Sequence, residues 1–584
     1  MLRHYLITAL RNLSRNKLFT CINLLGLSLS IAIFLTLTGY VRYHFSYDKF
    51  YEDGDRIFRV NYSEYQGGQP VLESARTHDR TALLIHEYVP QVEAVTRVYH
   101  EKAYVWTENI KLVDQVMLYA DSSFFKVFDV KIISGSADKS LVAPLSVMIS
   151  KSQAHTYFGE RDPLGETIFF NERLPFVITG IFEDIPPTSS IEFDFLLSWS
   201  TMPFYGWIRK DGDFSYPWTF TYVRLADNVS DVVPINRQLT RLANEQIISL
   251  KHKGHTASYS LQPYTSLHTA QPRTGEIMPG ANKTVLYALI SLSVFILVAG
   301  WVNYVNLSLS QSLERAEELG VRKVFGAGRR NISGQFLMEA LILSVAAFAA
   351  GFGLYPVFTG PLSHLFFNDL PFLPLDRITF ALYSLGFVVI TALVAFYPAV
   401  FISGFRPAFI MKNQLKGKNA GLLHHGLIVF QFFLAICVIA FTVIAGRQIE
   451  FMQSFDSGFN ASQTIALRAP ASTNSDSLRL TRWIAFRNEV LQQSAFASGT
   501  FSFNIPGEPI RFHDESVHAV GSENEQKQSY SVLWADEGFV ETFGLKLLAG
   551  RNFRQQEIAK TCLVNESAAR ALGYNDPLDV VNTM

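Results

Sequence analysis

Five long stretches of this chain contain no Asp, Glu, Lys or Arg, and they limit its fold more than any other feature. They are residues 18–41, 284–313, 340–368, 378–405 and 419–446. A membrane helix needs about 20 mostly apolar residues, and helices in soluble cores rarely reach that length without a charge. Charged residues make up 17% of the chain, against about 25% in typical soluble domains. The sequence therefore predicts a polytopic α-helical membrane protein with five spans.

Basic residues in the short connecting segments predict the orientation of the spans. Lys and Arg gather before the first span, after the second and after the fourth. These segments lie on one side if every span crosses, and the positive-inside rule places that side in the cytoplasm. Residues 42–283, 361–377 and 447–584 are then expected outside. The first span exceeds the 7–15 apolar residues of a signal peptide and lacks an A-x-A-like site after it, so we expect it to be retained.

Residues 2–13 have the pattern of an amphipathic helix. Leu2, Leu6, Ala9 and Leu13 follow helical spacing, with Arg3 off that stripe. A basic amphipathic helix can lie flat on an anionic membrane surface, which makes lipid an expected partner. The alternative is that this segment is only the cytoplasmic start of the first span.

The segment 42–283 is predicted to be an α+β domain. Residues 56–62 and 176–182 have strand patterns bounded by Gly and Pro. Residues 150–158 and 233–250 have helical patterns. Strands and helices do not alternate in the way that a parallel sheet requires.

The two large outside segments contain a repeat. An Asp, two Phe, a Lys and a Gly recur at the same spacing 415 residues later: Asp121, Phe124, Phe128, Lys131 and Gly135 match Asp536, Phe539, Phe543, Lys546 and Gly550. Asp-Pro-Leu at 162–164 matches 576–578 in the same order. We expect a duplicated unit of one span, one outside domain and three further spans. On this hypothesis the chain is incomplete, and three more spans follow residue 584.

Several classes of chemistry find no support in the sequence. There is no G-x-x-x-x-G-K-[ST] phosphate loop, no H-E-x-x-H and no G-x-S-x-G. His252 and His255 have no acid or cysteine near them to complete a metal site. The net charge of −1 gives no reason to expect a nucleic-acid partner, and three cysteines cannot make a disulfide scaffold. We expect no enzyme activity, no metal and no cofactor in this chain.

The segment from the end of the second span into the following loop carries a family resemblance. It reads Asn-Tyr-Val-Asn-Leu-Ser-Leu-Ser-Gln-Ser-Leu-Glu-Arg-Ala-Glu-Glu-Leu-Gly-Val-Arg-Lys-Val-Phe-Gly-Ala over 303–327. This segment resembles MacB/FtsX-type ABC transporter permeases, as do residues 9–17, Tyr-Asp-Lys-Phe at 47–50 and Tyr-Pro-Ala at 397–399. The resemblance is closest to the duplicated, MacB-like permeases of Bacteroidota-type bacteria. A full member of that type has eight spans, whereas five are found here.

The resemblance implies a domain order. We expect a cytoplasmic amphipathic helix (1–18), a first span (19–41), a first periplasmic MacB-like core domain (42–283) and an FtsX-like permease domain (284–403) with a cytoplasmic loop at 311–334. A cytoplasmic loop (404–425), a fifth span (426–446) and an incomplete second periplasmic domain (447–584) follow. The implied location is the bacterial inner membrane, with a cytoplasmic N-terminus.

The resemblance also implies a task for the loop, which is to dock as a short helix into a groove of a separate ATPase subunit. The loop has charges that can form surface ion pairs and glycines that allow close approach and a turn. Its candidate coupling residues are Glu314, Arg315, Glu317, Glu318, Gly320, Val321, Arg322, Lys323, Gly326 and Ala327. Without the resemblance, an ordinary positive-inside loop would be the preferred interpretation.

Three polar residues lie in or near the spans. Asn303 and Asn306 in the second span are candidates for hydrogen bonds between helices. Glu339 is placed about one turn into the third span, where an acid is costly unless it is paired or reaches water. It is expected to hydrogen-bond within the bundle, or to steady the loop through Arg329 or Arg330, or simply to reach water.

The expected function is that of an ABC transporter permease subunit. It would couple ATP hydrolysis by the separate ATPase to motion of the periplasmic domains (mechanotransmission), for export, efflux or extrusion. The alternative is an FtsX-like signalling subunit that senses a peptide or controls a cell-wall hydrolase without moving cargo. Further partners that the resemblance implies are a periplasmic adaptor, an outer-membrane channel and a second copy of the chain.

Overall fold

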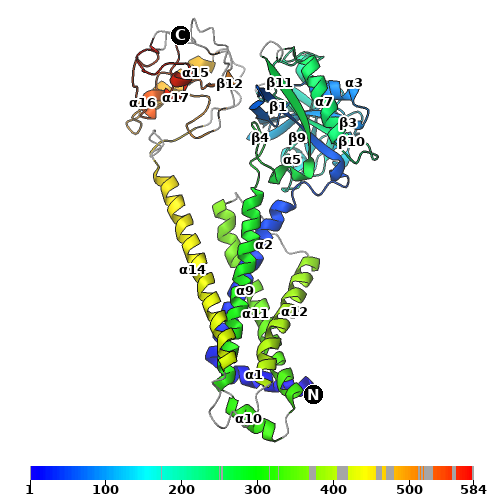
Figure 1. Ribbon diagram of the computed structural model, residues 1–584. Coiled ribbons are helices and arrows are strands. Elements are labelled where there is room, and N and C mark those ends of the chain that lie inside the picture. Colours follow the sequence, from blue (N-terminus) through cyan, green and yellow to red (C-terminus); the bar gives the residue numbers. More distant parts are fainter. Residues whose placement is uncertain are drawn as a thin grey trace.

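The computed structural model shows a bundle of long helices with two extramembrane domains at one end (Figure 1). It describes residues 2–171, 174–248, 250, 254–314, 316–325, 328–366, 377–403, 418–455, 463–467, 479–508, 510, 513–514, 517, 530–554 and 561–581. The helix that begins the chain and the loop between the second and third spans lie together at the opposite end of the bundle. We call this opposite end the basic end.

Among the described residues, the bundle contains five helices that are long and apolar enough to cross a membrane, as predicted. They are α2 (Lys17–Phe45), α9 (Lys283–Glu314), α11 (Arg329–Phe366), α12 (Arg377–Ser403) and α14 (Lys418–Ser454). Two shorter helices, α1 (Leu2–Arg15) and α10 (Ala316–Val324), lie at the basic end.

Helix α2 is the centre of the bundle and packs against both α9 and α11. Small residues let these helices approach closely, as is common in membranes. A Cβ atom added at Gly351 of α11 would lie 2.8 Å from the Ser28 carbonyl oxygen and 2.9 Å from the Ile31 Cβ of α2. A Cβ added at Gly300 of α9 would lie 2.6 Å from the Ser30 hydroxyl oxygen. The packing therefore requires glycine at Gly351, where the obstacle is backbone, while a side chain at Gly300 would have to displace the Ser30 hydroxyl.

Helices α2, α9, α11 and α14 are longer than their charge-free windows. Helix α11 begins at Arg329, inside the loop expected at 311–334, and α14 runs from Lys418 to Ser454, beyond both predicted ends. A charged residue stops a charge-free window, but it does not stop a helix, because Lys and Arg can extend from a helix end into water. The expected domain boundaries at 334, 425 and 446 thus fall within helices.

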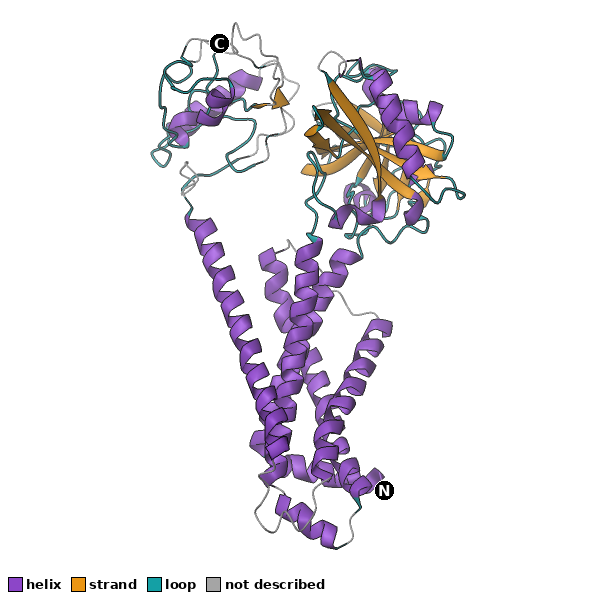
Figure 2. Cartoon of the chain, viewed as in Figure 1, coloured by secondary structure: helices purple, strands orange, loops and turns teal. Residues whose placement is uncertain are grey.

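The first extramembrane domain has a mixed sheet covered by helices (Figure 2). Its strands are β1 (Ile57–Gln66), β2 (Gln69–Ser74), β3 (Val92–Trp106), β4 (Lys111–Ala120), β5 (Ile132–Ser134), β6 (Ser146–Ser150), β7 (Thr167–Phe170), β8 (Leu174–Phe182), β9 (Phe195–Ser198), β10 (Phe220–Leu225) and β11 (His255–Pro263). The helices are η1 (Gly54–Arg56), α3 (Thr81–Tyr88), α4 (Phe124–Val127), α5 (Lys151–Phe158), α6 (Thr201–Phe204), α7 (Val233–Gln246) and η2 (Tyr264–Thr269).

The strand order is β11-β1-β10-β3-β4-β9-β6-β8-β5, with β2 on β1 and β7 bridging β3 and β8. Only the β4–β9 and β6–β8 pairs are parallel among these strands. The α+β prediction is confirmed. The expected strands at 56–62 and 176–182 are parts of β1 and β8, and the expected helices are α5 and α7. Helix α7 ends at Gln246, earlier than predicted.

The second extramembrane domain follows α14. Its described elements are α15 (Arg479–Leu491), β12 (His513–Asp514), β13 (Tyr530–Ser531), α16 (Phe539–Thr542) and α17 (Glu566–Ala571).

The repeat in the sequence recurs as repeated local geometry. Helices α4 and α16 begin at Phe124 and Phe539, 415 residues apart. Ser150 caps α5 by accepting a hydrogen bond from the backbone of Gln153, and Asn565 caps α17 in the same way from Ala568. Shared turns at one offset are what a duplicated domain predicts.

Candidate functional site

The loop helix α10 lies beyond the bundle, at the end farthest from the extramembrane domains (Figure 1). Three apolar side chains at its C-terminal end are exposed: Val321 by 56%, Val324 by 66% and, directly after the helix, Phe325 by 85%. The spacing i, i+3, i+4 places them on one side of the helix. An exposed apolar edge on a charged helix is typical of a surface that another protein or a membrane covers.

The charged residues of α10 partly bond to one another and to α11. Arg322 forms an i, i+4 ion pair with Glu318 and donates a 3.2 Å hydrogen bond to Gln335 Oε1 on α11. An exposed pair of this kind contributes only about 0.3–0.5 kcal/mol, so its role is orientation rather than stability. Partial burial and the positive charge of Arg329 lower the pKa of Lys323.

Not every predicted coupling residue can be placed. Glu314, Glu317 and Gly320 lie in α9 and α10, but their side chains are outside the described part of the chain. Arg315, Gly326 and Ala327 lie outside the described residues altogether. The sequence interpretation included Val321 but missed Val324 and Phe325, although their apolar spacing within a charged segment was visible in the sequence.

Glu339 lies well inside α11 and is hydrogen-bonded across helices. Its Oε1 accepts a 2.6 Å bond from the Asn12 amide of α1 and a 3.3 Å bond from the Gln335 amide. Of the expectations for Glu339, hydrogen bonding within the bundle is observed, with the Asn12 and Gln335 amides as donors. A second bond, from the Tyr5 hydroxyl to Asn331 Oδ1 at 3.0 Å, also joins α1 to α11.

The two asparagines of α9 face different neighbours. The Asn306 amide donates a 3.0 Å hydrogen bond to Gln431 Oε1 of α14, so it joins two spans as predicted. The Asn303 amide nitrogen packs against Gly26, 3.4 Å from where a Cβ atom would lie on that glycine of α2. These contacts place both residues in interfaces between spans.

At the other end of the bundle, α2 is fixed to the first extramembrane domain by Asp48. This fully buried residue has φ = 62°, a conformation that Asp tolerates better than most residues. Its carboxylate accepts bonds from the backbone nitrogen of Ser190 at 2.7 Å and from the Ser190 hydroxyl at 2.5 Å. Burial raises the pKa of Asp48 to about 6, against the effect of these bonds. Asp48 belongs to the Tyr-Asp-Lys-Phe segment that the sequence singled out without a role.

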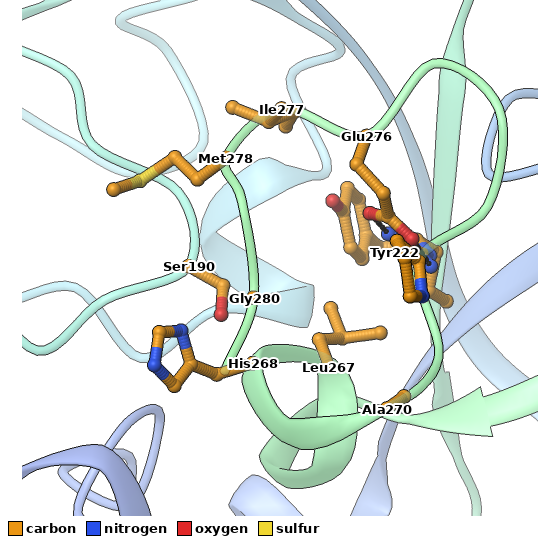
Figure 3. A pocket seen from close by; sticks show the side chains of 11 residues that line it. Ser190, Tyr222, Leu267, His268, Ala270, Glu276, Ile277, Met278 and Gly280 are labelled. Atoms are coloured by element: carbon orange, nitrogen blue, oxygen red, sulfur yellow. Dashed lines mark hydrogen bonds and ion pairs between the residues drawn. The ribbon is translucent and has the colours of Figure 1, made fainter. Parts of the chain in front are cut away.

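His268 of η2 connects the same junction to α9. It is 2.7 Å from His44 of α2 through their ring nitrogens, and its carbonyl oxygen accepts a 2.6 Å bond from the backbone of Ala281, just before α9. Burial, with the charge of His44, lowers the pKa of His268 to about 4. Figure 3 shows Ser190 and His268 in the wall of a pocket that also includes Glu276 and Tyr222. Helices α2 and α9 thus enter the domain through one packed junction.

Comparison with protein families places these elements in a known arrangement. A model of the MacB-like periplasmic core domain matches residues 20–242, and a model of the FtsX-like permease C-terminal domain matches residues 290–407. The chain belongs to the MacB/FtsX-type ABC transporter permeases. The first match covers most of α2 and most of the first extramembrane domain of the permease, and the second covers most of α9 together with α10, α11 and α12.

Individual relatives match this chain with low sequence identity. The macrolide export ATP-binding/permease protein MacB of Neisseria meningitidis is 28% identical over 225 residues, 38% of this chain and 32% of that protein. The pyoverdine export ATP-binding/permease protein PvdT of Pseudomonas savastanoi is 26% identical over 241 residues, 40% of this chain and 33% of that protein. The matched region thus spans about a third of the length of these relatives.

Among solved structures, the periplasmic region of MacB from Actinobacillus actinomycetemcomitans is 15% identical, with a TM-score of 0.27. The match covers 37% of this chain and 91% of that one.

Proposed function

We propose that this permease couples ATP hydrolysis by a separate cytoplasmic ATPase subunit to motion of its extramembrane domains, for export or extrusion of a substrate. The observation that carries the proposal is the exposed apolar edge of α10, formed by Val321, Val324 and Phe325. The chain offers this edge at the basic end, opposite the extramembrane domains (Figure 1). The names of the relatives, which join ATP-binding and permease functions in one export protein, support the pairing with an ATPase.

The path from α10 to the domains supports the mechanical part of the proposal. Helix α9 leads from α10 to the junction at His268, and α2 reaches the same junction at Asp48. The buried bonds there hold the two helices and the domain together. A shift of α9 relative to α2 at the basic end would therefore be passed to the domain rather than absorbed by a flexible linker.

The docking surface gives the direct test of this function. Val324→Glu puts a charge into the apolar edge and should weaken binding of the co-purified ABC ATPase about 10-fold or more, with loss of stimulated ATP hydrolysis. Val324→Leu keeps the apolar contact and should bind within about twofold of the unmodified chain. Affinity is measured by titrating the ATPase onto the full chain in nanodiscs. Equal affinity for Val324→Glu and Val324→Leu would contradict docking through this edge.

The orientation of the permease is tested by cysteine labelling. In a background without native cysteines, Glu160→Cys lies in the first extramembrane domain at a side chain that is 96% exposed. Gly328→Cys lies at an exposed residue between α10 and α11. A membrane-impermeant thiol reagent should label the first in intact spheroplasts and the second only after permeabilisation. The reverse pattern would place the basic end outside.

A further inference from the structure

A chain of hydrogen bonds crosses three helices at the basic end. Arg322 on α10 donates to the side-chain oxygen Oε1 of Gln335 at 3.2 Å, and the Gln335 side-chain amide donates to Glu339 Oε1 at 3.3 Å. The Asn12 amide of α1 donates to the same Glu339 oxygen at 2.6 Å. We call these four residues the basic-end network. Asn12 and Glu339 are 327 residues apart in the sequence, so the network joins the start of the chain to the permease loop.

Each hydrogen bond of the network has a defined donor and a defined acceptor. Gln335 uses its oxygen toward Arg322 and its amide toward Glu339, so a flip of its side chain would lose both bonds. Glu339 can only accept when it is ionised, and Asn12 supplies it with the shorter of the two bonds. Bonds to an ionised carboxylate are shorter and stronger than bonds between neutral groups. The network therefore favours one orientation of α10 relative to α11 and α1.

Glu339 lies in surroundings where the loss of its hydrogen bonds is costly. Its side chain is partly buried between α1 and α11, where an ionised carboxylate needs donors to offset lost hydration. On the other side of α1, Leu6 is 44%, Ile7 55% and Leu10 50% exposed. Helix α1 thus presents an apolar face away from α11 and holds the network with its polar face.

We infer that Glu339 is a positioning residue that links α10 to the N-terminal helix α1, so that both helices move as one unit with the start of α11. Resting on the proposed function, this inference adds that α1 takes part in transmission, since an ATPase that moves α10 also moves α1. The docking contact itself lies elsewhere, at Val321, Val324 and Phe325. Disturbing Glu339 should therefore leave the affinity for the ATPase unchanged and lower the rate of ATP hydrolysis that binding stimulates.

A double variant that exchanges the amide and the carboxylate between positions 12 and 339, here called the reversed pair, distinguishes this role from a general loss of structure. Asn12→Asp places a second carboxylate against Glu339, and like charges at hydrogen-bond distance repel. Adding Glu339→Gln to Asn12→Asp restores an amide-to-carboxylate bond with its direction reversed. Ser14→Asp is the matched control, because it adds the same charge at an exposed position of α1.

The first measurement needs no ATPase. Spin labels at Leu6→Cys and Gly328→Cys in the full chain, reconstituted in nanodiscs, report the distance between α1 and the α10–α11 connection. We expect a broader distance distribution for Asn12→Asp, and the unmodified distribution for both the reversed pair and Ser14→Asp. A single distribution shared by all four chains would overturn the inference.

The second measurement titrates the co-purified ABC ATPase and follows ATP hydrolysis. Asn12→Asp should lower the maximal stimulated rate about 10-fold, within the usual range of coupling between sites, while the ATPase concentration at half-maximal rate stays within about twofold. The reversed pair should recover the rate. A reversed pair as inactive as Asn12→Asp, or an unchanged rate in Asn12→Asp, would overturn the inference. Failure of the docking proposal is seen separately, as unchanged ATPase affinity in Val324→Glu.

Discussion

Replacing Gly351 by leucine should prevent the membrane bundle from packing. A Cβ atom at this position would already lie 2.8 Å from the Ser28 carbonyl oxygen and 2.9 Å from Ile31 Cβ, and a leucine extends further. Because a backbone oxygen cannot rotate away, α11 must separate from α2, with loss of the contacts between Leu27, Ile31, Leu343 and Ala347. Overpacking a well-packed core costs about 1–3 kcal/mol and occasionally more, and we expect the upper end here.

The matched control lies two residues away on the same helix. Gly353 is exposed, and an added Cβ would meet no atom within 4 Å. Gly353→Leu should therefore keep the monodisperse peak of the purified full chain after heating, whereas Gly351→Leu should lose it well below the temperature at which the unmodified chain does. Both variants add the same side chain to one span, so hydrophobicity and insertion are matched. Equal heat resistance of the two would mean that α2 and α11 are not packed as described.

The close approach at Gly351 also illustrates which features of the fold could be predicted from the sequence and which could not. Charge-free windows found all five spans, because crossing a membrane imposes a length and a composition that are visible locally. They did not find the ends, since α11 continues to Arg329 through residues that a hydropathy criterion excludes. Nor did they reveal that Gly300 and Gly351 both pack on α2, which depends on the arrangement of three helices.

The candidate site, too, could be predicted from the sequence only in part. Its location in the 314–327 loop came from a local resemblance, and Asn306 was correctly predicted to bond between spans. The partner of Glu339 was not predictable from spacing, because Asn12 precedes it by 327 residues and nothing local links them. The role of Asp48 was hidden for the same reason, since Ser190 lies 142 residues away. Local patterns locate elements, whereas pairing across the fold requires the structure.

Replacing Asp121 by alanine should loosen the first extramembrane domain strongly. The Asp121 carboxylate accepts three bonds from Arg97, at 2.8 Å from the backbone nitrogen and at 3.0 and 2.7 Å from the guanidinium. The Arg97 side chain is only 8% exposed, so removal of its hydrogen-bonding carboxylate leaves a buried charge with only the Trp199 ring, 4.4 Å away, and the nearby charge of Asp79. Such a loss costs about 3–5 kcal/mol. Amide exchange in β3 and β4 should accelerate roughly 100-fold or more, provided these strands exchange by global opening of the domain. Asp211→Ala, at a fully exposed ion pair with Arg209, should leave exchange unchanged.

The sequence repeat leads to the same prediction for the second extramembrane domain, with a smaller expected effect. Asp536 occupies the position of Asp121 in the second extramembrane domain and binds Arg487 at 2.5 Å. Arg487 also pairs with Glu537 at 2.8 Å, so Asp536→Ala leaves that arginine with an acidic partner. Exchange in α15 should therefore rise less in Asp536→Ala than exchange in β3 rises in Asp121→Ala, and the double variant Asp536→Ala with Glu537→Ala should remove the difference. If Asp536→Ala alone were as damaging as Asp121→Ala, Glu537 would not share the charge of Arg487. The two copies of the domain would then hold their arginines through a single aspartate each.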